Sequence, residues 1–575
     1  MPDFLLARRR GHTALIAALL AVGVSACGGS SGGGGTVNGA GGGDNASSTS
    51  DTSASSAARG GTLVVGAEQE PDCADWIAVC AGNIWGSYMM QTTTLPTAFD
   101  TREVDGSWTL VPSEVLAGEP EVVVRGGKQT ITYEIDPRAV WSDGEPISSA
   151  DFAYTATQIR DGEGIFDKTG YDQIEKVETP DEKTAVVTMR STYGPWRALF
   201  GGSYSLLPAH LLRGKDRNAL MKDGYSFSGG PWKIEKWQKG NSVTLVPNDR
   251  YWGAKPKLDK VVFQFIPDTA AAFQALKSGQ VQSLYPSPQV DAISQIKNGI
   301  PNTRVEVDAA TGNLEALWMN NARFPFDSKA VREAVAYAVD REAIVERLYG
   351  PLGVEDPAQS FVTPLVGAFA GSDFSRFSAD PAKVDEIMEA DGWARDGSGI
   401  WAKDGRAAEF SIVSLAGNKR RELTEQILQQ QLGEAGFKMT IANTTPAELF
   451  GKVAPSGDYQ LGLWTLIDQY PEPSLSATFS SRSIPTEANG NSGINFMRAR
   501  IPGVDELLGT VDRSTDQAQR RAASLEADAL IAADVPSLPI ATVPNVLMTS
   551  DSIGGPVSIN PSEGPWWNLE EWTRG

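Results

Sequence analysis

Histidine is almost absent from this chain of 575 residues, which contains only two. His210 is the only histidine beyond residue 26. HExxH zinc sites and histidine clusters are therefore excluded, and a Ser-His-Asp triad could use only His210. The GxSxG pattern of serine hydrolases and the GxxxxGK[ST] phosphate loop are also missing. We therefore expect a protein that is not an enzyme, without catalytic residues, a cofactor or a metal site.

Positive charge is scarce as well, because 50 Lys and Arg residues stand against 71 Asp and Glu residues. The net charge is −21, and nucleic-acid binding needs basic surfaces, so no nucleic-acid partner is expected. Beyond residue 26 the sequence contains no apolar run long enough to span a membrane. The roughly 515 residues after position 60 are too many for one ordinary core, so two or three domains are expected.

The first of only three cysteines, Cys27, ends the apolar stretch AVGVSACGGS. Arg8, Arg9 and Arg10 precede an apolar segment, 13–24, of the length found in signal peptides. The small residues before Cys27 resemble a bacterial lipobox. That resemblance implies a signal peptide over 1–26 and a lipid on Cys27, which would anchor the protein to the extracytoplasmic face of the cell membrane. A plain signal peptide or a short buried helix is the alternative.

Residues 27–60 are rich in glycine and serine and hold too few apolar side chains to fold. As a flexible coil they would form a tether of roughly 30 Å. The two other cysteines, Cys73 and Cys80, form an even pair, and a disulfide is their natural state outside the cytoplasm. Two free buried thiols are the alternative, whereas a metal site would need further ligands nearby.

The first half of the remaining chain shows strand and turn patterns. We expect strands at 61–68, 131–135 and 185–189, and a hairpin over 229–248. Ser148 or Ser149 can cap a helix that runs to about residue 159. These elements indicate at least one α/β domain.

The second half alternates more regularly. A helix is expected at 329–339, and Asp340 can cap another. Strands at 410–416, 437–443 and 458–466 alternate with helices at 419–436 and 446–453. This order predicts parallel strand pairing, and ligands of such sheets bind beyond the carboxyl ends of the strands. The segment just past the third strand, IDQYPEPS at 467–474, is therefore a candidate binding segment.

Four blocks of the sequence together resemble one family. They are VWSDGEPISSADF (140–152), GGPWKIEKW with YWGAKPKLDKVVFQFIPD (229–268), VREAVAYAVDREAIVERLYG (331–350) and LWTLIDQYPEPS (463–474). In this order they resemble the family 5 extracellular solute-binding lipoproteins, which are the oligopeptide- and dipeptide-binding proteins of ABC importers. The resemblance covers the chain from residue 61 to its end.

The resemblance implies an α/β, bilobal fold like that of the type II periplasmic binding proteins, with an extra subdomain. Lobe I would comprise 61–310 and 541–575, with the extra subdomain near 95–195. Lobe II would comprise 311–540, and a hinge would let the two lobes close over the ligand.

The implied function is the capture of short peptides between the lobes and their delivery to an ABC permease and its ATPase subunits. We expect a monomer. A sugar, a nickel chelate or a siderophore is the alternative cargo. A secreted hydrolase that uses His210, or an adhesion or signalling protein, is the alternative class.

In peptide-binding members of the family, an acidic residue just before the tyrosine of a YP[DE]P-like segment holds the peptide amino group. Here Gln469 precedes Tyr470, and Asp468 lies one position earlier. A local bulge would let Asp468 serve as this acid, because a buried ammonium needs a counter-charge. Otherwise the amine is held elsewhere or is absent, or the loop contacts no ligand.

Three further residues are candidates for ligand contact. Glu68 ends the first strand, where the resemblance implies a ligand-contacting acid. Trp464 lies in the last strand and would either wall a pocket or belong to the core. Asn495, in NSGINF, matches a family segment near the cleft. Trp141 and Trp252 are expected to be packing residues.

Overall fold

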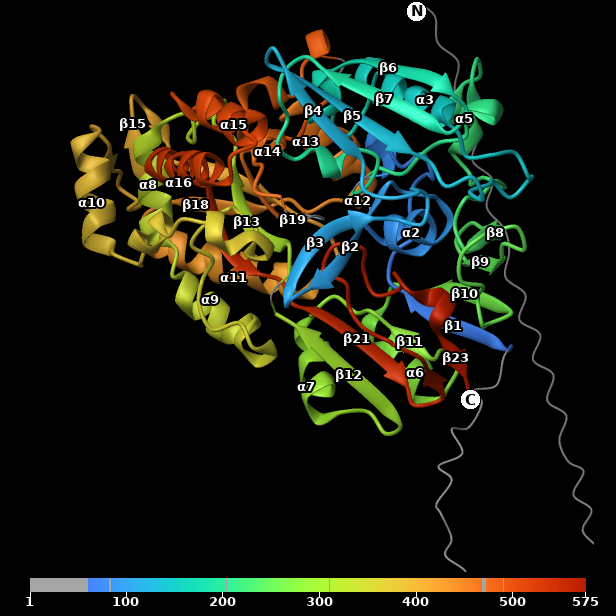
Figure 1. Ribbon diagram of the computed structural model, residues 1–575. Helices are drawn as coiled ribbons and strands as arrows, with labels where there is room; N and C mark the ends of the chain where they lie inside the picture. Colours follow the sequence, from blue (N-terminus) through green and yellow to red (C-terminus); the bar gives the residue numbers. More distant parts are fainter. Residues whose placement is uncertain (1–59, 82–83, 203, 310, 468–471, 490) are drawn as a thin grey trace, which may run out of the picture. The chain divides into compact units, whose positions relative to one another are not determined.

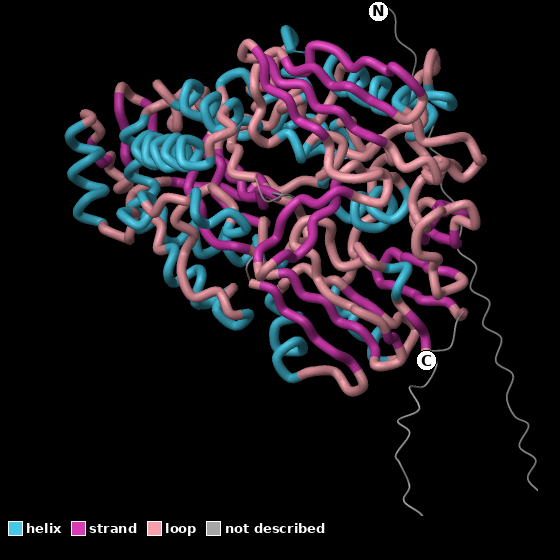
Figure 2. The backbone as a smooth tube through the Cα atoms, viewed as in Figure 1, coloured by secondary structure: helices cyan, strands magenta, loops and turns pink. Residues whose placement is uncertain are grey.

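The computed structural model describes residues 60–575 except 82–83, 203, 310, 468–471 and 490. Strands gather in three principal sheets (Figures 1 and 2). The largest sheet has seven strands in the order β12 (Thr303–Asp308), β21 (Asn545–Ser550), β11 (Ser283–Leu284), β1 (Thr62–Ala67), β10 (Lys260–Phe265), β9 (Ser242–Pro247) and β8 (Trp232–Gln238). We call the part built on this sheet the first lobe.

The predicted strand at 61–68 is β1, which lies in the middle of the seven-stranded sheet. It pairs in parallel with both β10 and β11, and Leu63 and Val65 are fully buried. Such a strand needs apolar side chains on both faces, which explains the continuous run TLVVGA. The predicted hairpin is formed by β8 and β9, which pair antiparallel.

A four-stranded antiparallel sheet belongs to the same lobe. Its strands are, in order, β4 (Glu121–Arg125), β5 (Lys128–Glu134), β7 (Thr184–Met189) and β6 (Ile174–Asp181). Helix α3 (Ser149–Asp161) contacts this sheet and starts at a capping box formed by Ser148 and Asp151. Ser148 is one of the two predicted N-cap residues. A separate hairpin is made by β2 (Phe99–Val104) and β3 (Ser107–Pro112).

The second lobe is built on a five-stranded sheet. Its order is β18 (Lys438–Ile441), β17 (Glu409–Val413), β19 (Leu461–Ile467), β13 (Asn313–Met319) and β20 (Ser537–Thr542). β17 pairs in parallel with both β18 and β19, which confirms the predicted strand–helix alternation. β13 runs antiparallel to β19 and β20, so the sheet as a whole is mixed.

The helix predicted at 446–453 is less regular than expected. It consists of α12 (Pro446–Glu448), a π-helical turn (Leu449–Val453) and α13 (Ala454–Ser456). Pro455 has no N–H to donate to the carbonyl four residues back, so a regular α-helix cannot continue through it. The helix itself was predicted, whereas its π-helical turn was not.

The longer helices otherwise follow the sequence pattern. Both α8 (Lys329–Ala338) and α9 (Arg341–Leu348) were expected, and α9 is capped by the Asp340 carboxylate. Helices of eight residues or more besides α3 are α6 (Thr269–Lys277), α7 (Val290–Asn298), α8 (Lys329–Ala338), α9 (Arg341–Leu348), α10 (Pro381–Ala390), α11 (Lys419–Glu434), α15 (Val504–Arg513) and α16 (Gln517–Asp534).

Two neighbouring connections join the lobes, one between β12 and β13 and one between β20 and β21. They are tied to each other, because Thr311 Oγ1 donates to the carbonyl of Val543 over 2.9 Å and the Val543 N–H donates to the carbonyl of Asn313 over 2.8 Å. Asn313 Nδ2 also donates to Asn545 Oδ1 over 3.0 Å. Short paired connections of this kind suit a hinge.

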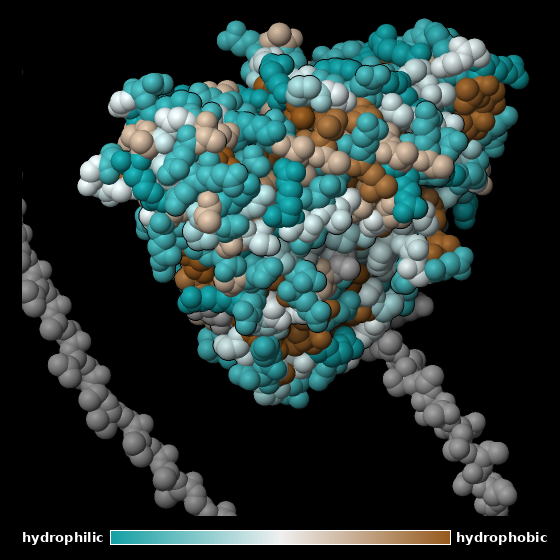
Figure 3. All heavy atoms as spheres, turned by 90° about the vertical axis from the view of Figure 1, so that its left-hand side faces the viewer, coloured by the Kyte–Doolittle hydropathy of each residue, from teal (hydrophilic) through white to brown (hydrophobic). Residues whose placement is uncertain are grey.

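The surface in Figure 3 is largely hydrophilic, with apolar residues in patches between polar ones. Among the described residues, no helix has the length and apolar character that crossing a membrane requires.

Several carboxyl groups are buried in the folded chain, and burial raises their pKa. It raises the pKa to about 7 for Glu68, Glu425, Glu563 and Glu570, and to about 6 for Asp512 and Asp528. The folded state therefore holds protons that the unfolded chain releases at lower pH. Stability from these groups is complete below the unfolded pKa and is lost as the pH rises through 6 to 7.

We therefore expect the free energy of unfolding to be larger at about pH 5 than at about pH 8, by at least about 2 kcal/mol. Urea unfolding at both pH values measures it. Glu68→Gln and Glu425→Gln should each reduce the difference, whereas Glu448→Gln, at an exposed position, should not. A free energy that stays constant or rises toward pH 8 would contradict this expectation.

Candidate ligand-binding cavity

A cavity of about 540 Å³ lies where residues of both lobes meet. This volume falls within the range of roughly 300–1,000 Å³ that is usual for ligand sites. Its aromatic lining includes Trp85, Tyr88, Tyr285, Trp318, Phe450 and Trp464. Ligand pockets typically combine such apolar walls with a few fixed polar groups, so this cavity is the best candidate for a binding site.

The ends of parallel strands supply much of the cavity wall. Gln69 follows β1, and Tyr285 follows β11 in the first lobe. In the second lobe Leu415 follows β17, and Thr465–Ile467 form the end of β19. The carboxyl ends of parallel strands therefore face the cavity, as the sequence pattern predicts.

Trp464 stacks on Trp318 inside this wall. The ring centroids are 5.8 Å apart with an angle of 13° between the planes, and Trp318 Nε1 donates to the Trp464 carbonyl over 2.8 Å. A methyl group at Gly462 would lie 2.0 Å from the Trp464 ring. Gly462 therefore gives the ring its space, and Trp464 is at once a core residue, 5% exposed, and part of the cavity wall.

One buried carboxylate in the second lobe is shared by two arginines. Arg421 donates to Glu315 through Nε over 2.6 Å and Nη2 over 3.1 Å, and Arg420 Nη2 lies 3.4 Å from the same carboxylate. Both arginines line the cavity at the start of α11, and Glu315 is fully buried in β13. Burial alone would raise the pKa of Glu315, but the two guanidinium groups outweigh it and lower that pKa to about 2.

The cluster of Glu315, Arg420 and Arg421 therefore carries one net positive charge. Arg420 Nε is buried and has no hydrogen-bond partner. Buried guanidinium groups normally bind an anion or a carbonyl, and a carboxylate fits their planar geometry best. The cavity thus offers a cationic position for an acidic group of a ligand.

Acidic side chains lie on the first-lobe side. Burial raises the pKa of Glu68 to about 7, although a hydrogen bond from Ser287 opposes the shift. Glu68 Oε1 is buried without a hydrogen-bond partner. Its neighbour Gln69 and its partner Ser287 line the cavity, as does Asp72. Glu68 itself is not among the residues that line the cavity, so Asp72 is the acidic residue that the first lobe places in the cavity wall.

The model of the family called bacterial extracellular solute-binding proteins, family 5, matches residues 112–484. This range is more than half of the chain. The chain belongs to this family.

Relatives of this family 5 protein include peptide-binding proteins. Oligopeptide-binding protein OppA of Mycobacterium tuberculosis is 26% identical over 94% of this chain and 90% of its own length. A Brucella melitensis protein named as an ABC transporter peptide-binding protein is 24% identical over 86% of this chain and 95% of its own. AppA of Bacillus subtilis, solved with a nonapeptide, shares the fold with a TM-score of 0.78, 21% identity and coverage of 90% and 100%. The bilobal α/β fold is thereby confirmed.

Some predicted site residues of the family 5 protein lie outside the described residues. These are Asp468, Gln469 and Tyr470 in the segment after β19, and Cys27. The described part of the same segment begins at Glu472. The Glu472 carboxylate accepts a hydrogen bond from Arg520 Nη2 over 2.6 Å, so it is tied to α16.

Asn495 lies in the core of the second lobe. It is fully buried, and its amide donates to the carbonyls of Ser480 and Ala499 and accepts from the Ala499 N–H. Ile494 and Phe496 line the cavity, but Asn495 does not. The segment thus reaches the cavity through Ile494 and Phe496, whereas the Asn495 amide holds backbone groups of the core.

The remaining predictions concern residues in the first lobe. Cys73 and Cys80 are joined by a disulfide with a Cα–Cα distance of 5.9 Å, and Cys80 borders the cavity. His210 Nε2 lies 2.8 Å from Asp143 Oδ2 and is not among the cavity residues.

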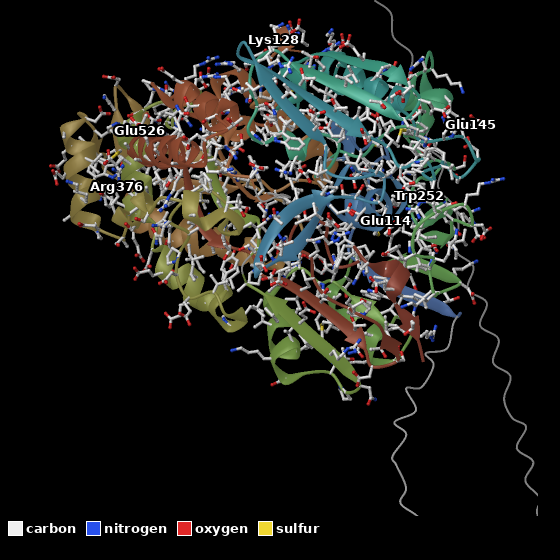
Figure 4. The ribbon with its side chains drawn as sticks, in the orientation of Figure 1. Glu114, Lys128, Glu145, Trp252, Arg376 and Glu526 are labelled. Carbon is white, nitrogen blue, oxygen red and sulfur yellow. A yellow bond between two sulfur atoms is a disulfide. The ribbon has the colours of Figure 1, made fainter. Side chains whose placement is uncertain are left out.

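Trp141 and Trp252 both pack within the first lobe. Trp141 is fully buried, and Trp252 donates to the carbonyl of Glu114 over 3.0 Å, beside which it lies in Figure 4. In the described part of the chain, no group of three or more His, Cys, Asp or Glu is placed to hold a metal ion.

Proposed function

We propose that this protein is the receptor of an ABC importer and binds short peptides in the inter-lobe cavity. The observation that carries the proposal is the net positive cluster of Glu315, Arg420 and Arg421, which suits a peptide carboxylate. Asp72, which lines the cavity from the other lobe, suits the peptide amine. Asp468 remains our sequence-based choice for that role, and Glu68 is a second candidate. The peptide-binding names of the relatives support the same ligand class.

A zwitterionic ligand would explain why opposite charges face one cavity. Aromatic walls suit varied apolar side chains, and main-chain bonds would hold an extended peptide. A sugar carries neither charge, so it leaves the arginine cluster unexplained. A nickel chelate or siderophore with carboxylates would use the same cluster, and it is our second candidate.

Blocking the C-terminal carboxylate of a peptide ligand tests the proposal. We expect trialanine to stabilise the full chain against heat, by about 2.7 kcal/mol at 100 times its dissociation constant. Its C-terminal amide should bind at least about 10-fold more weakly, a loss of about 1.4 kcal/mol, because the arginine cluster then has no anion to neutralise. N-acetylated trialanine and glucose serve as comparisons in calorimetry. Equal affinity for the free acid and the amide would remove the proposed role of the arginines.

We further propose that a lipid on Cys27 anchors the receptor beside its permease. Cys27→Ala should move the protein from the membrane fraction to the soluble fraction of expressing cells, whereas Ser31→Ala should leave it in place. Immunoblots of both fractions and the mass of the mature N-terminus measure this. Retention of the Cys27→Ala protein in the membrane fraction would refute the anchor.

A further inference from the structure

The two lobes also meet away from the cavity. The loop 190–197 follows β7 of the four-stranded sheet, and its Gly194 contacts the end of α15 and Arg520 of α16 in the second lobe. The N–H of Gly194 donates to the carbonyl of Asp512. A methyl group at Gly194 would lie 2.3 Å from the Ser514 carbonyl oxygen and 3.1 Å from Arg520 Nε. Gly194 is therefore placed where no side chain fits, and in Figure 1 α15 lies close to this sheet.

Arg520 is the residue beneath this contact. It is 2% exposed, donates through Nε to the carbonyl of Val511 over 2.9 Å, and forms the ion pair with Glu472. Burial raises the pKa of the Glu472 carboxyl. The positive charges of Arg520 and of Arg197, which lies in the loop 190–197, both oppose this rise. The ion pair is thus made within the second lobe, and Gly194 of the first lobe lies against Arg520.

The segment that Glu472 begins leads directly to the cavity. Asp512 accepts hydrogen bonds from Ser474 Oγ over 2.6 Å and from Ser476 Oγ, so α15 holds this segment at two more points. Two residues further on, in the short helix α14 (Ser476–Phe479), Thr478 lines the cavity. Residues 472–478 therefore connect the docked loop to the ligand site.

We propose that Arg520 is a positioning residue for ligand capture: with the loop 190–197 docked, it fixes Glu472 and adds to the hold of Asp512 on the segment 472–478 at the cavity. The loop excludes water from the Arg520–Glu472 pair, and an ion pair is stronger in such a low-dielectric environment. When the lobes separate, water reaches the pair and weakens it, so the Glu472 end of the cavity-lining segment is held less firmly. This inference rests on the proposed function, because it assumes that the cavity takes up a ligand when the lobes close.

Hydrogen–deuterium exchange of the ligand-free full chain tests the positioning step. In Gly194→Val the loop cannot dock, and we expect the amides of 472–478 to exchange at least about 10-fold faster than in the unmodified protein. Arg520→Met should give the same result, and Arg520→Lys should restore part of the protection. Gly118→Val is the matched control, because Gly118 is exposed and no atom lies within 4 Å of the position that a methyl group would take there. Unchanged exchange in Gly194→Val would overturn the proposal.

The rate at which trialanine dissociates tests the link to capture. It should rise at least about 10-fold in Gly194→Val and Arg520→Met, with a smaller change in the association rate, because affinity differences usually reside in dissociation. Equal dissociation rates would restrict Arg520 to a structural role and overturn its part in capture. If the unmodified protein binds no peptide, the proposed function fails by itself, and the exchange result still decides whether docking fixes the segment.

Discussion

Replacing Glu315 by alanine is expected to lower the free energy of unfolding by roughly 3–5 kcal/mol. The substitution leaves Arg420 and Arg421, 3% and 7% exposed in their side chains, without the carboxylate that they share. Two buried positive charges would then repel each other, and Thr465 would lose its acceptor on Glu315. Urea or guanidinium unfolding at neutral pH, followed by circular dichroism, measures the effect.

Two comparisons show whether the charge itself is responsible. Glu448→Ala removes an exposed carboxylate that pairs with Lys452 on the surface, and it should cost no more than about 1 kcal/mol. The triple change of Glu315, Arg420 and Arg421 to methionine should recover most of the stability, because apolar groups can replace a buried ion cluster. The same triple variant should lose the preference for a free peptide carboxylate. If Glu315→Ala is as stable as Glu448→Ala, the cluster does not contribute to stability as described.

The strand–helix alternation of the second lobe was predictable because it depends on neighbours in the sequence. Hydrophobic runs of strand length separated by capped helices indicate parallel pairing, and β17, β18 and β19 follow that rule. The position of the cavity at the strand ends follows from the same pattern. The π-helical turn at Leu449–Val453 was not predicted, since it depends on how Pro455 interrupts one helix.

The charged cluster of the cavity could not be read from the sequence. Arg420 and Arg421 lie 105 and 106 positions from Glu315, and only the folded sheet brings them together. The one available signal was a pair of adjacent arginines at the start of a helix that follows a strand. Asn495 shows the opposite case, because its segment reaches the cavity while its own side chain points to backbone groups in the core.

Replacing Arg341 by leucine is the second change with a large expected effect. Arg341 is 3% exposed and donates through Nη1 to the carbonyls of Ala358 over 2.7 Å and Pro539 over 2.9 Å. Its Nη2 donates to the carbonyls of Phe374 over 2.7 Å and Phe377 over 3.2 Å. Burial lowers its pKa to about 10, so the guanidinium is still charged at neutral pH. One cation therefore ties α9 to three other segments of the second lobe.

Arg341→Leu should cost at least about 3 kcal/mol, because each buried acceptor left without a donor costs about 1–3 kcal/mol. Arg341→Lys should recover part of this loss, since an ammonium group has three donors but lacks the span of the guanidinium. Arg347→Leu, at an exposed position near the end of α9, is the matched control and should change stability by no more than about 0.5 kcal/mol. Since the lost bonds all lie in the second lobe, hydrogen exchange should increase most in α9 and β20. An increase confined to the first lobe would show that the four carbonyls are satisfied without Arg341.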